Sequence, residues 1–173
     1  MDIMNFLSID CSTDTGSLFV KVKNKTFSKV LQSDKSNNDL LMKQILDFFE
    51  ENNLSLDNIS EILVNQGPGN FSGLRSSLAV AKGVSLAKNL KLSGYNTFIW
   101  SCAKYFDKED PIYSLIEFKK RYFIKRFDKN LKSHSKIREI SEEIIIRKYS
   151  SKFLVVPKNM SKQFSKKILE LNN

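Results

Sequence analysis

The sequence contains a single histidine, only two cysteines and no long apolar run. Cys11 and Cys102 lack the spacing of a metal site, and they fit a reduced cytoplasmic protein better than a disulfide framework, although nothing forbids their pairing. The N-terminus carries an acid without a basic flank, which argues against a secretory signal. Apolar runs such as residues 153–156 are far shorter than the roughly 20 residues of a membrane span. We therefore expect a cytoplasmic protein without a membrane segment.

The scarcity of histidine also limits the chemistry that the chain can perform. His134 lies in the polar stretch "KNLKSHSKIR" and is expected at the surface. A zinc-binding HExxH helix needs two histidines, so that site is excluded. Cys11 could act as a nucleophile only if His134 came to it from a distant loop. We predict no catalytic residue, no metal site and no cofactor.

Charge is distributed unevenly along the chain. Residues 1–103 carry 10 basic and 10 acidic side chains, whereas residues 104–173 carry 18 basic and 9 acidic ones. This excess permits contact with RNA through the second part. However, 23 of the basic residues are lysines and 5 are arginines, and a lysine-rich solvated surface explains the same pattern without a ligand. We favour the solvated surface, and both interpretations stay open.

The order of the predicted elements indicates a mixed α/β protein. A meander of three strands is expected over residues 5–32, and a helix over 38–52. A buried strand at 60–66 leads into a glycine-rich loop and a long helix, followed by a short strand and a helix beginning near Asn96. Beyond a charged linker, we predict a strand hairpin over 111–128, a helix capped by Ser141, a strand at 152–157 and a last helix at 161–171.

The loop "NQGPGNFSGLR" raises the question of an anion site. Its glycines have neither the dinucleotide-binding nor the Walker A spacing. Even so, a glycine-rich turn before a helix can hold an anion on free backbone N–H groups, and Asp10 at the end of the first strand begins a polar turn. The candidate anion or nucleotide site comprises Asp10, Ser12, Thr13, Gly67, Gly69, Asn70 and Arg75. A turn-capping role for Asp10 is equally open.

Small residues recur along one face of the helix that follows this loop. Gly and Ala side chains let another backbone approach closely. This face could press on the sheet within the monomer or pair with a helix of another subunit. The helix at 38–52 carries two apolar stripes, more than one core face needs, although burial on most sides would explain this equally. The predicted partner interface comprises Leu41, Ile45, Phe48, Gly73, Ser77, Val80, Gly83, Val84 and Ala87.

Two motifs together resemble the TsaB (YeaZ-like) family. They are "FLSIDCSTDTGSLFV", residues 6–20, and "GPGNFSGLRSSLAVAKGVSLA", residues 67–87. The second follows the family pattern "GPGSFTGLRxGxxxAKGLA" closely, and the hairpin at 114–127 follows its counterpart less closely. The first motif departs at Ser12, where actin-like ATPases carry a glycine. The resemblance is good over about the first 100 residues, and the second lobe looks shortened.

This resemblance implies an actin-like ATPase (ribonuclease H-like) fold, with a complete N-terminal lobe at 1–106 and a shortened, basic C-terminal lobe at 107–173. It implies a non-catalytic subunit that binds and activates a TsaD-like enzyme for threonylcarbamoylation of adenosine 37 in tRNA, with a TsaE-like ATPase in the same complex. Pairing would use helices of the N-terminal lobe, which could also form a homodimer. We expect contact with tRNA to be indirect.

Three alternatives remain at this stage. A nucleotide-binding ATPase or phosphotransferase of the actin-like class would use Asp10, Thr13 and Gly69. Ser12 at the glycine position and the short second lobe argue against it. A peptidase, an older label for this broader family, lacks a plausible metal or nucleophile site. Direct tRNA binding by the lysine-rich second lobe predicts a steep dependence on salt.

Overall fold

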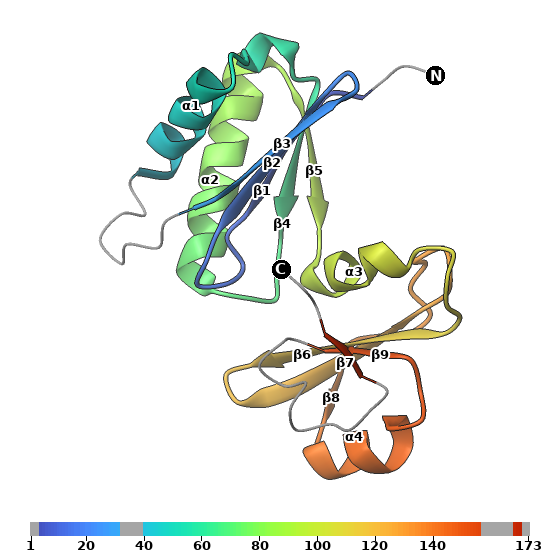
Figure 1. Ribbon diagram of the computed structural model, residues 1–173. Coiled ribbons are helices and arrows are strands. Elements are labelled where there is room, and N and C mark those ends of the chain that lie inside the picture. Colours follow the sequence, from blue (N-terminus) through green and yellow to red (C-terminus); the bar gives the residue numbers. More distant parts are fainter. Residues whose placement is uncertain (1–3, 32–39, 157–167, 171–173) are drawn as a thin grey trace. The chain divides into compact units, whose positions relative to one another are not determined.

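The computed structural model divides into two compact units, residues 1–97 and 98–173. It describes residues 4–31, 40–156 and 168–170, and each unit contains a five-stranded sheet (Figure 1). The mixed α/β class predicted from the sequence is confirmed. We placed the division after residue 106, whereas Phe98 and Cys102 belong to an apolar cluster of the second unit in the structure.

The sheet of the first unit has the strand order β3-β2-β1-β4-β5. The first three strands form the predicted antiparallel meander, and β4 and β5 run parallel to β1. The strands are β1 (Phe6–Asp10), β2 (Ser17–Val22), β3 (Lys25–Val30), β4 (Glu61–Asn65) and β5 (Lys91–Tyr95). Because β1, β4 and β5 are adjacent and parallel, their carboxyl ends meet at one edge of the sheet.

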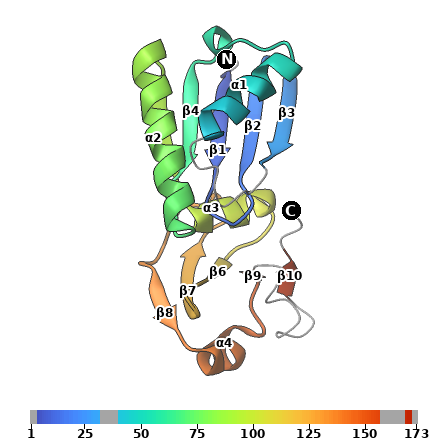
Figure 2. The ribbon, with the colours of Figure 1, turned by 90° about the vertical axis from the view of Figure 1, so that its left-hand side faces the viewer.

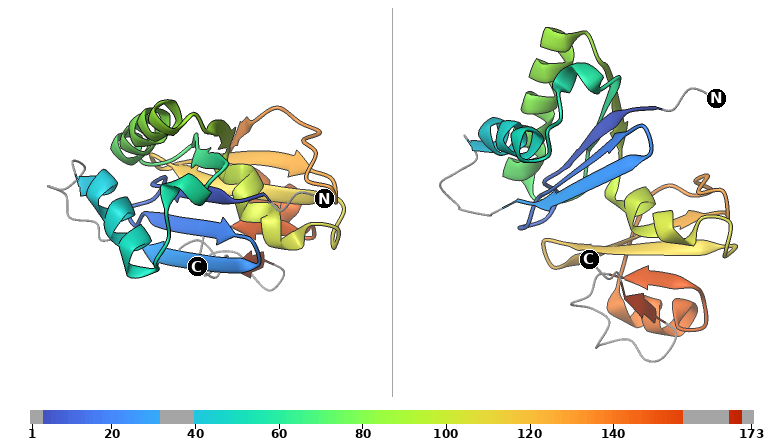
Figure 3. Two further views of the ribbon diagram at one scale, coloured as in Figure 1. Left: turned by 90° about the horizontal axis from the view of Figure 1, so that it is seen from above. Right: turned by 45° about the horizontal axis from the view of Figure 1, so that its top comes forward.

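Two helices, α1 (Leu41–Glu51) and α2 (Phe71–Lys88), lie side by side on the same face of this sheet (Figures 2 and 3). The apolar spacing of α1 buries Leu41, Ile45 and Phe48 against the strands. A left-handed residue, Asn89, with a φ of 50°, ends α2. A short 3₁₀ turn, η2 (Leu56–Asn58), precedes β4.

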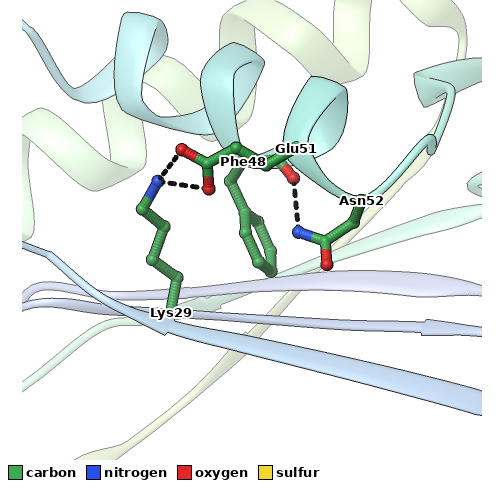
Figure 4. Close-up of polar contacts among 4 residues, drawn as sticks. All are labelled: Lys29, Phe48, Glu51 and Asn52. Atoms are coloured by element: carbon green, nitrogen blue, oxygen red, sulfur yellow. Dashed lines mark hydrogen bonds and ion pairs between the residues drawn. The ribbon is translucent and has the colours of Figure 1, made fainter.

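The end of α1 is also tied to the edge of the sheet by polar contacts (Figure 4). The Lys29 ammonium of β3 lies 2.7 Å from the Glu51 carboxylate, and the Asn52 amide donates a hydrogen bond to the Phe48 carbonyl. An exposed ion pair of this kind contributes at most about 1 kcal/mol. The buried Phe48 ring therefore contributes more to the docking of α1 than the ion pair does.

The second unit has the strand order β10-β9-β6-β7-β8. Its strands are β6 (Ile112–Phe118), β7 (Arg121–Phe127), β8 (Arg138–Ile140), β9 (Leu154–Val156) and β10 (Ile168–Glu170), and its helices are α3 (Thr97–Cys102), η3 (Ala103–Tyr105) and α4 (Glu142–Tyr149). The predicted alternation in the hairpin is confirmed. Phe123 and Phe127 pack with the α3 cluster, and Tyr122 and Ile124 pack with the α4 cluster on the other face.

Two expectations for the second unit were wrong or incomplete. Residues 168–170 were predicted to be helical, but they form a strand that pairs in parallel with β9. The rest of that predicted helix, residues 161–167 and 171, lies outside the described residues. No strand was predicted at 138–140, where β8 extends the hairpin. Both strands are only three residues long, and such short strands owe their conformation to the neighbouring strand.

Adjacent residues of α1 provide a test of which face is buried. Ile45 is fully buried, whereas Leu46 is 48% exposed. We expect Ile45→Ala to lower the free energy of unfolding by about 2–5 kcal/mol, because it leaves a cavity. The matched control Leu46→Ala should change it by less than about 0.5 kcal/mol. Urea unfolding followed by far-UV circular dichroism measures both, and equal effects would contradict the assignment of faces.

Candidate functional site

Polar side chains meet where the parallel strands β1, β4 and β5 end. One Asp10 carboxylate oxygen accepts a hydrogen bond from the Ser12 backbone N–H at 2.8 Å. The other accepts from the Asn65 amide at 2.9 Å and from the Tyr95 hydroxyl at 3.3 Å. Both oxygens of Asp10 thus already have partners within the protein. This arrangement matches a carboxylate that organises its turn.

Asn65 lies at the centre of this network and is almost fully buried. Its amide nitrogen also donates to the Ser12 hydroxyl at 3.1 Å. Its amide oxygen accepts from the Gly67 backbone N–H at 2.8 Å and from the Thr97 hydroxyl at 3.2 Å. One side chain therefore joins the turn after β1 to the glycine-rich loop after β4. We name the Asp10–Ser12–Asn65–Tyr95–Thr97 set the strand-end network.

The glycine-rich loop lies directly against the turn after β1. The Asn70 backbone N–H donates to the Ser12 carbonyl at 2.6 Å. A Cβ atom on Gly69 would lie 2.2 Å from the Ser12 carbonyl oxygen, and one on Gly73 would lie 2.2 Å from that of Cys11. Both glycines are required by this close backbone contact, because any side chain would collide with the turn. The Asn70 side chain caps α2 by accepting from the Gly73 N–H at 3.1 Å.

The structure brings together most of the residues predicted for an anion site, and their contacts are with one another. Asp10, Ser12, Gly67, Gly69 and Asn70 lie in or beside the strand-end network. The other two residues make their contacts elsewhere: the Thr13 hydroxyl donates to the Thr15 carbonyl, and the Arg75 guanidinium lies over the Phe71 ring.

The family model of TsaD, described as tRNA N6-adenosine threonylcarbamoyltransferase, matches residues 32–124, more than half of the chain. The chain belongs to this family. A curated relative, the tRNA threonylcarbamoyladenosine biosynthesis protein TsaB of Buchnera aphidicola subsp. Baizongia pistaciae, is 36% identical over 90 residues. That match covers 51% of this chain and 40% of the relative, so it spans less than half of the relative's length.

Two solved structures from Pseudomonas aeruginosa share the fold. One is described as YeaZ, and the other as an uncharacterized protein with similarity to peptidase YEAZ. Each has a TM-score of 0.77 and 13% sequence identity, and each match covers 98% of this chain and 84% of the other. With the family match, this likeness confirms the resemblance given above: the chain is a TsaB/YeaZ-like protein of the actin-like ATPase superfamily.

Three members of the strand-end network of this TsaB/YeaZ-like chain were missed in the sequence. Asn65, Tyr95 and Thr97 stand at or just after the ends of β4 and β5. Asn65 could have been found, because it ends a predicted buried strand, as Asp10 does. Tyr95 could not, because its hydroxyl reaches Asp10 only when β5 is placed beside β4.

Burial makes one hydroxyl and two thiol groups of the chain poor acids. The pKa of Tyr95 is raised well above its usual range, first by burial and then by the Asp10 charge. The pKa of Cys11 is raised to about 11 by burial and by Asp10, and that of Cys102 is raised to about 11 by burial. Both thiols therefore stay protonated at neutral pH, where a thiol is a weak nucleophile.

Among residues 4–31, 40–156 and 168–170, no group of three or more His, Cys, Asp or Glu residues is placed to hold a metal ion. Within the same ranges, no helix is long and apolar enough to cross a membrane.

The residues predicted for the partner interface fall into three groups. Five are buried in the first unit: Leu41, Ile45, Phe48, Ser77 and Val84. Gly73 faces the Cys11 backbone. The other three, Val80, Gly83 and Ala87, are partly or fully exposed. Among the described residues, no atom beyond the adjoining helix backbone lies within 4 Å of a Cβ built on Gly83. The predicted surface therefore needs revision, since its α1 stripe faces the protein's own core.

Two glycines of α2 provide a matched test of the loop contact. Gly73→Ala places a methyl group against the Cys11 carbonyl and should lower the free energy of unfolding by about 1–3 kcal/mol. Gly83→Ala meets open space and should raise it by about 0.5–1 kcal/mol, because alanine favours the helix. Chemical denaturation of both variants measures the difference. Opposite signs support the close contact, and a stabilising Gly73→Ala would refute it.

Proposed function

We propose that this chain is a non-catalytic subunit that binds and activates a TsaD-like enzyme for threonylcarbamoylation of adenosine 37 in tRNA. The relative from Buchnera is described as a tRNA threonylcarbamoyladenosine biosynthesis protein. This supports the same pathway for the present chain. The partners we propose are a TsaD-like catalytic paralogue and, in the same complex, a TsaE-like ATPase. Contact with the enzyme would be made by the first unit.

The observation that carries this proposal is a side of α2 that runs from half-buried residues to exposed ones. Ser76, Val80, Gly83 and Ala87 follow one another at spacings of four, three and four residues, which places them on one side of the helix. The face has no side chain at Gly83 and only a methyl group at Ala87, so another helix can approach closely. We name these four residues the α2 small-residue face.

Exposed apolar side chains on the two helices of the first unit favour docking in water. Leu86 of α2 is 84% exposed and Leu46 of α1 is 48% exposed. Burying two leucines on association would contribute about 1.5–3 kcal/mol each. Since the α1 stripe first expected at the interface is buried, Leu46 is the α1 residue that we now propose for it. The same surface would serve a homodimer when the enzyme is absent.

Substitutions on the α2 small-residue face test the association. Gly83→Leu and Ala87→Glu should abolish co-elution with the same organism's TsaD-like protein in size exclusion, because each blocks close approach of the partner. The unfolding transition should be unchanged or raised for Gly83→Leu, since leucine favours the helix over glycine. Ala103→Glu, at an exposed alanine of η3, is the matched control and should co-elute normally. Normal co-elution of all three would refute the proposed interface.

If the chain were instead a nucleotide-binding ATPase of the actin-like class, it would bind ATP and magnesium. We expect titration of the chain with ATP and magnesium in a calorimeter to give no binding heat. The physical reason is that the turn at Ser12 occupies the space beside Gly69, and both Asp10 oxygens have protein partners. Heat with a micromolar dissociation constant that is lost in Asp10→Ala would favour the ATPase.

A further inference from the structure

A basic pocket lies on the α4 side of the second sheet, within the second unit. Its volume is about 210 Å³, and its lining includes Tyr113, Arg126, His134, Arg138 and Tyr149. None of these residues belongs to the strand-end network or to the α2 small-residue face. We name it the hairpin pocket.

Strand register explains why the two arginines converge. Arg126 of β7 pairs with Tyr113 of β6, and Arg138 of β8 pairs with Ile124 of β7. Positions 124 and 126 are two residues apart on β7, so both arginines belong to the sheet face that carries Ile124 and α4. Lys125 also lines the pocket, but its ammonium lies 5.5 Å from the ring centre of Phe127, whose side chain packs on the other face. The pocket therefore owes its charge chiefly to the two guanidinium groups.

Neither arginine forms an ion pair with a carboxylate among the residues that the structure describes. By contrast, Arg121 at the other end of β7 pairs with Glu139. Asp128, which follows β7, has other partners: its carboxylate lies 2.7 Å from the His134 ring nitrogen and accepts hydrogen bonds from two backbone N–H groups. Glu117 of β6 lies opposite Tyr122 of β7. Tyr122 is four residues from Arg126 on the same strand, a distance of about 13 Å at 3.3 Å per residue.

The loop beside Arg126 is held in place by hydrogen bonds. The Arg126 backbone N–H donates to the Ser135 hydroxyl at 2.9 Å, and the His134 N–H donates to the Arg126 carbonyl at 3.1 Å. Across the pocket, Tyr113 and Tyr149 contact each other edge to face, with ring centres 5.1 Å apart. The site thus combines ordered backbone, two guanidinium groups without carboxylate partners and aromatic rings.

We propose that the hairpin pocket binds a phosphate group of an RNA strand. A guanidinium fork matches two phosphate oxygens, and tyrosine rings offer surfaces on which a base can stack. The surroundings favour a polymer over a small anion, because residues 98–156 carry 14 basic and 8 acidic side chains. That surplus, spread beyond the pocket, attracts a chain of phosphates. The second unit then makes its own contact with RNA, which goes beyond the proposed activation of an enzyme.

Binding of a fluorescein-labelled single-stranded RNA of mixed sequence to the full chain, followed by anisotropy, tests this. The double variant Arg126→Gln/Arg138→Gln should weaken binding roughly tenfold or more. It should also make the plot of log affinity against log salt concentration shallower by about 1.4, the effect of two phosphate contacts on a single strand. Arg126→Lys/Arg138→Lys keeps the charge but not the fork and should weaken binding by less.

The matched control is Lys119→Gln/Lys120→Gln, which removes two charges from the turn at the far end of the same hairpin. It should weaken binding less than twofold. Equal losses in the control and the pocket variant would overturn the proposal, because they indicate diffuse attraction. An absence of RNA binding by the unsubstituted chain would also overturn it.

Competition with inorganic phosphate and AMP separates the polymer from a small ligand. Displacement of the RNA by either at micromolar concentration would overturn the assignment to an RNA strand. Co-elution of the pocket variant with the TsaD-like protein provides an independent measurement. Normal co-elution of the pocket variant with weakened RNA binding supports the pocket. Normal co-elution of the α2 variants would contradict the proposed function alone.

Discussion

The first unit depends on one contact between two backbone segments, the turn after β1 and the loop after β4. The Asn70 N–H binds the Ser12 carbonyl at 2.6 Å, and Gly69 and Gly73 leave no side chain between the segments. This contact sets where α2 begins and therefore which of its residues face the sheet. The strand-end network lies directly beneath it and satisfies the polar groups that the contact buries. Its glycines serve close packing of backbone on backbone.

Local patterns predicted the elements of the first unit well, because each is long enough to show its own period. Alternation and turn residues marked the meander, and the capping residue and glycines marked the start of α2. The sequence could not show which element each side chain packs against. The stripe Leu41–Ile45–Phe48 has the same spacing whether it faces a sheet or a partner, and only the packed sheet shows that it is core. The same limit hid Tyr95, whose role depends on the pairing of β4 with β5.

The second unit was harder to predict for a related reason. Its hairpin was found from the alternation of Tyr122 to Phe127, which sends aromatic residues to both faces. The three-residue strands β8 and β10 carry too few positions to show a period. The hairpin pocket likewise follows from register: Arg126 and Arg138 are twelve residues apart in the sequence, and the pairing of β7 with β8 places them on one face. Counting charges showed an excess of basic residues in this unit, but it did not show that Arg126 and Arg138 line one pocket.

Gly73 and Gly83 show how one motif can combine two physical constraints on a single helix. Both stand in the stretch that resembles the family, and their spacing of ten residues turns them about 80° apart around α2. Gly73 is fixed from within, because the Cys11 carbonyl occupies the space of its side chain. No contact among the residues that the structure describes accounts for Gly83, and a glycine in an exposed helix interior costs about 0.5–1 kcal/mol relative to alanine. A glycine that weakens its own helix without a packing reason among the described residues supports the proposal that this side of α2 meets another chain.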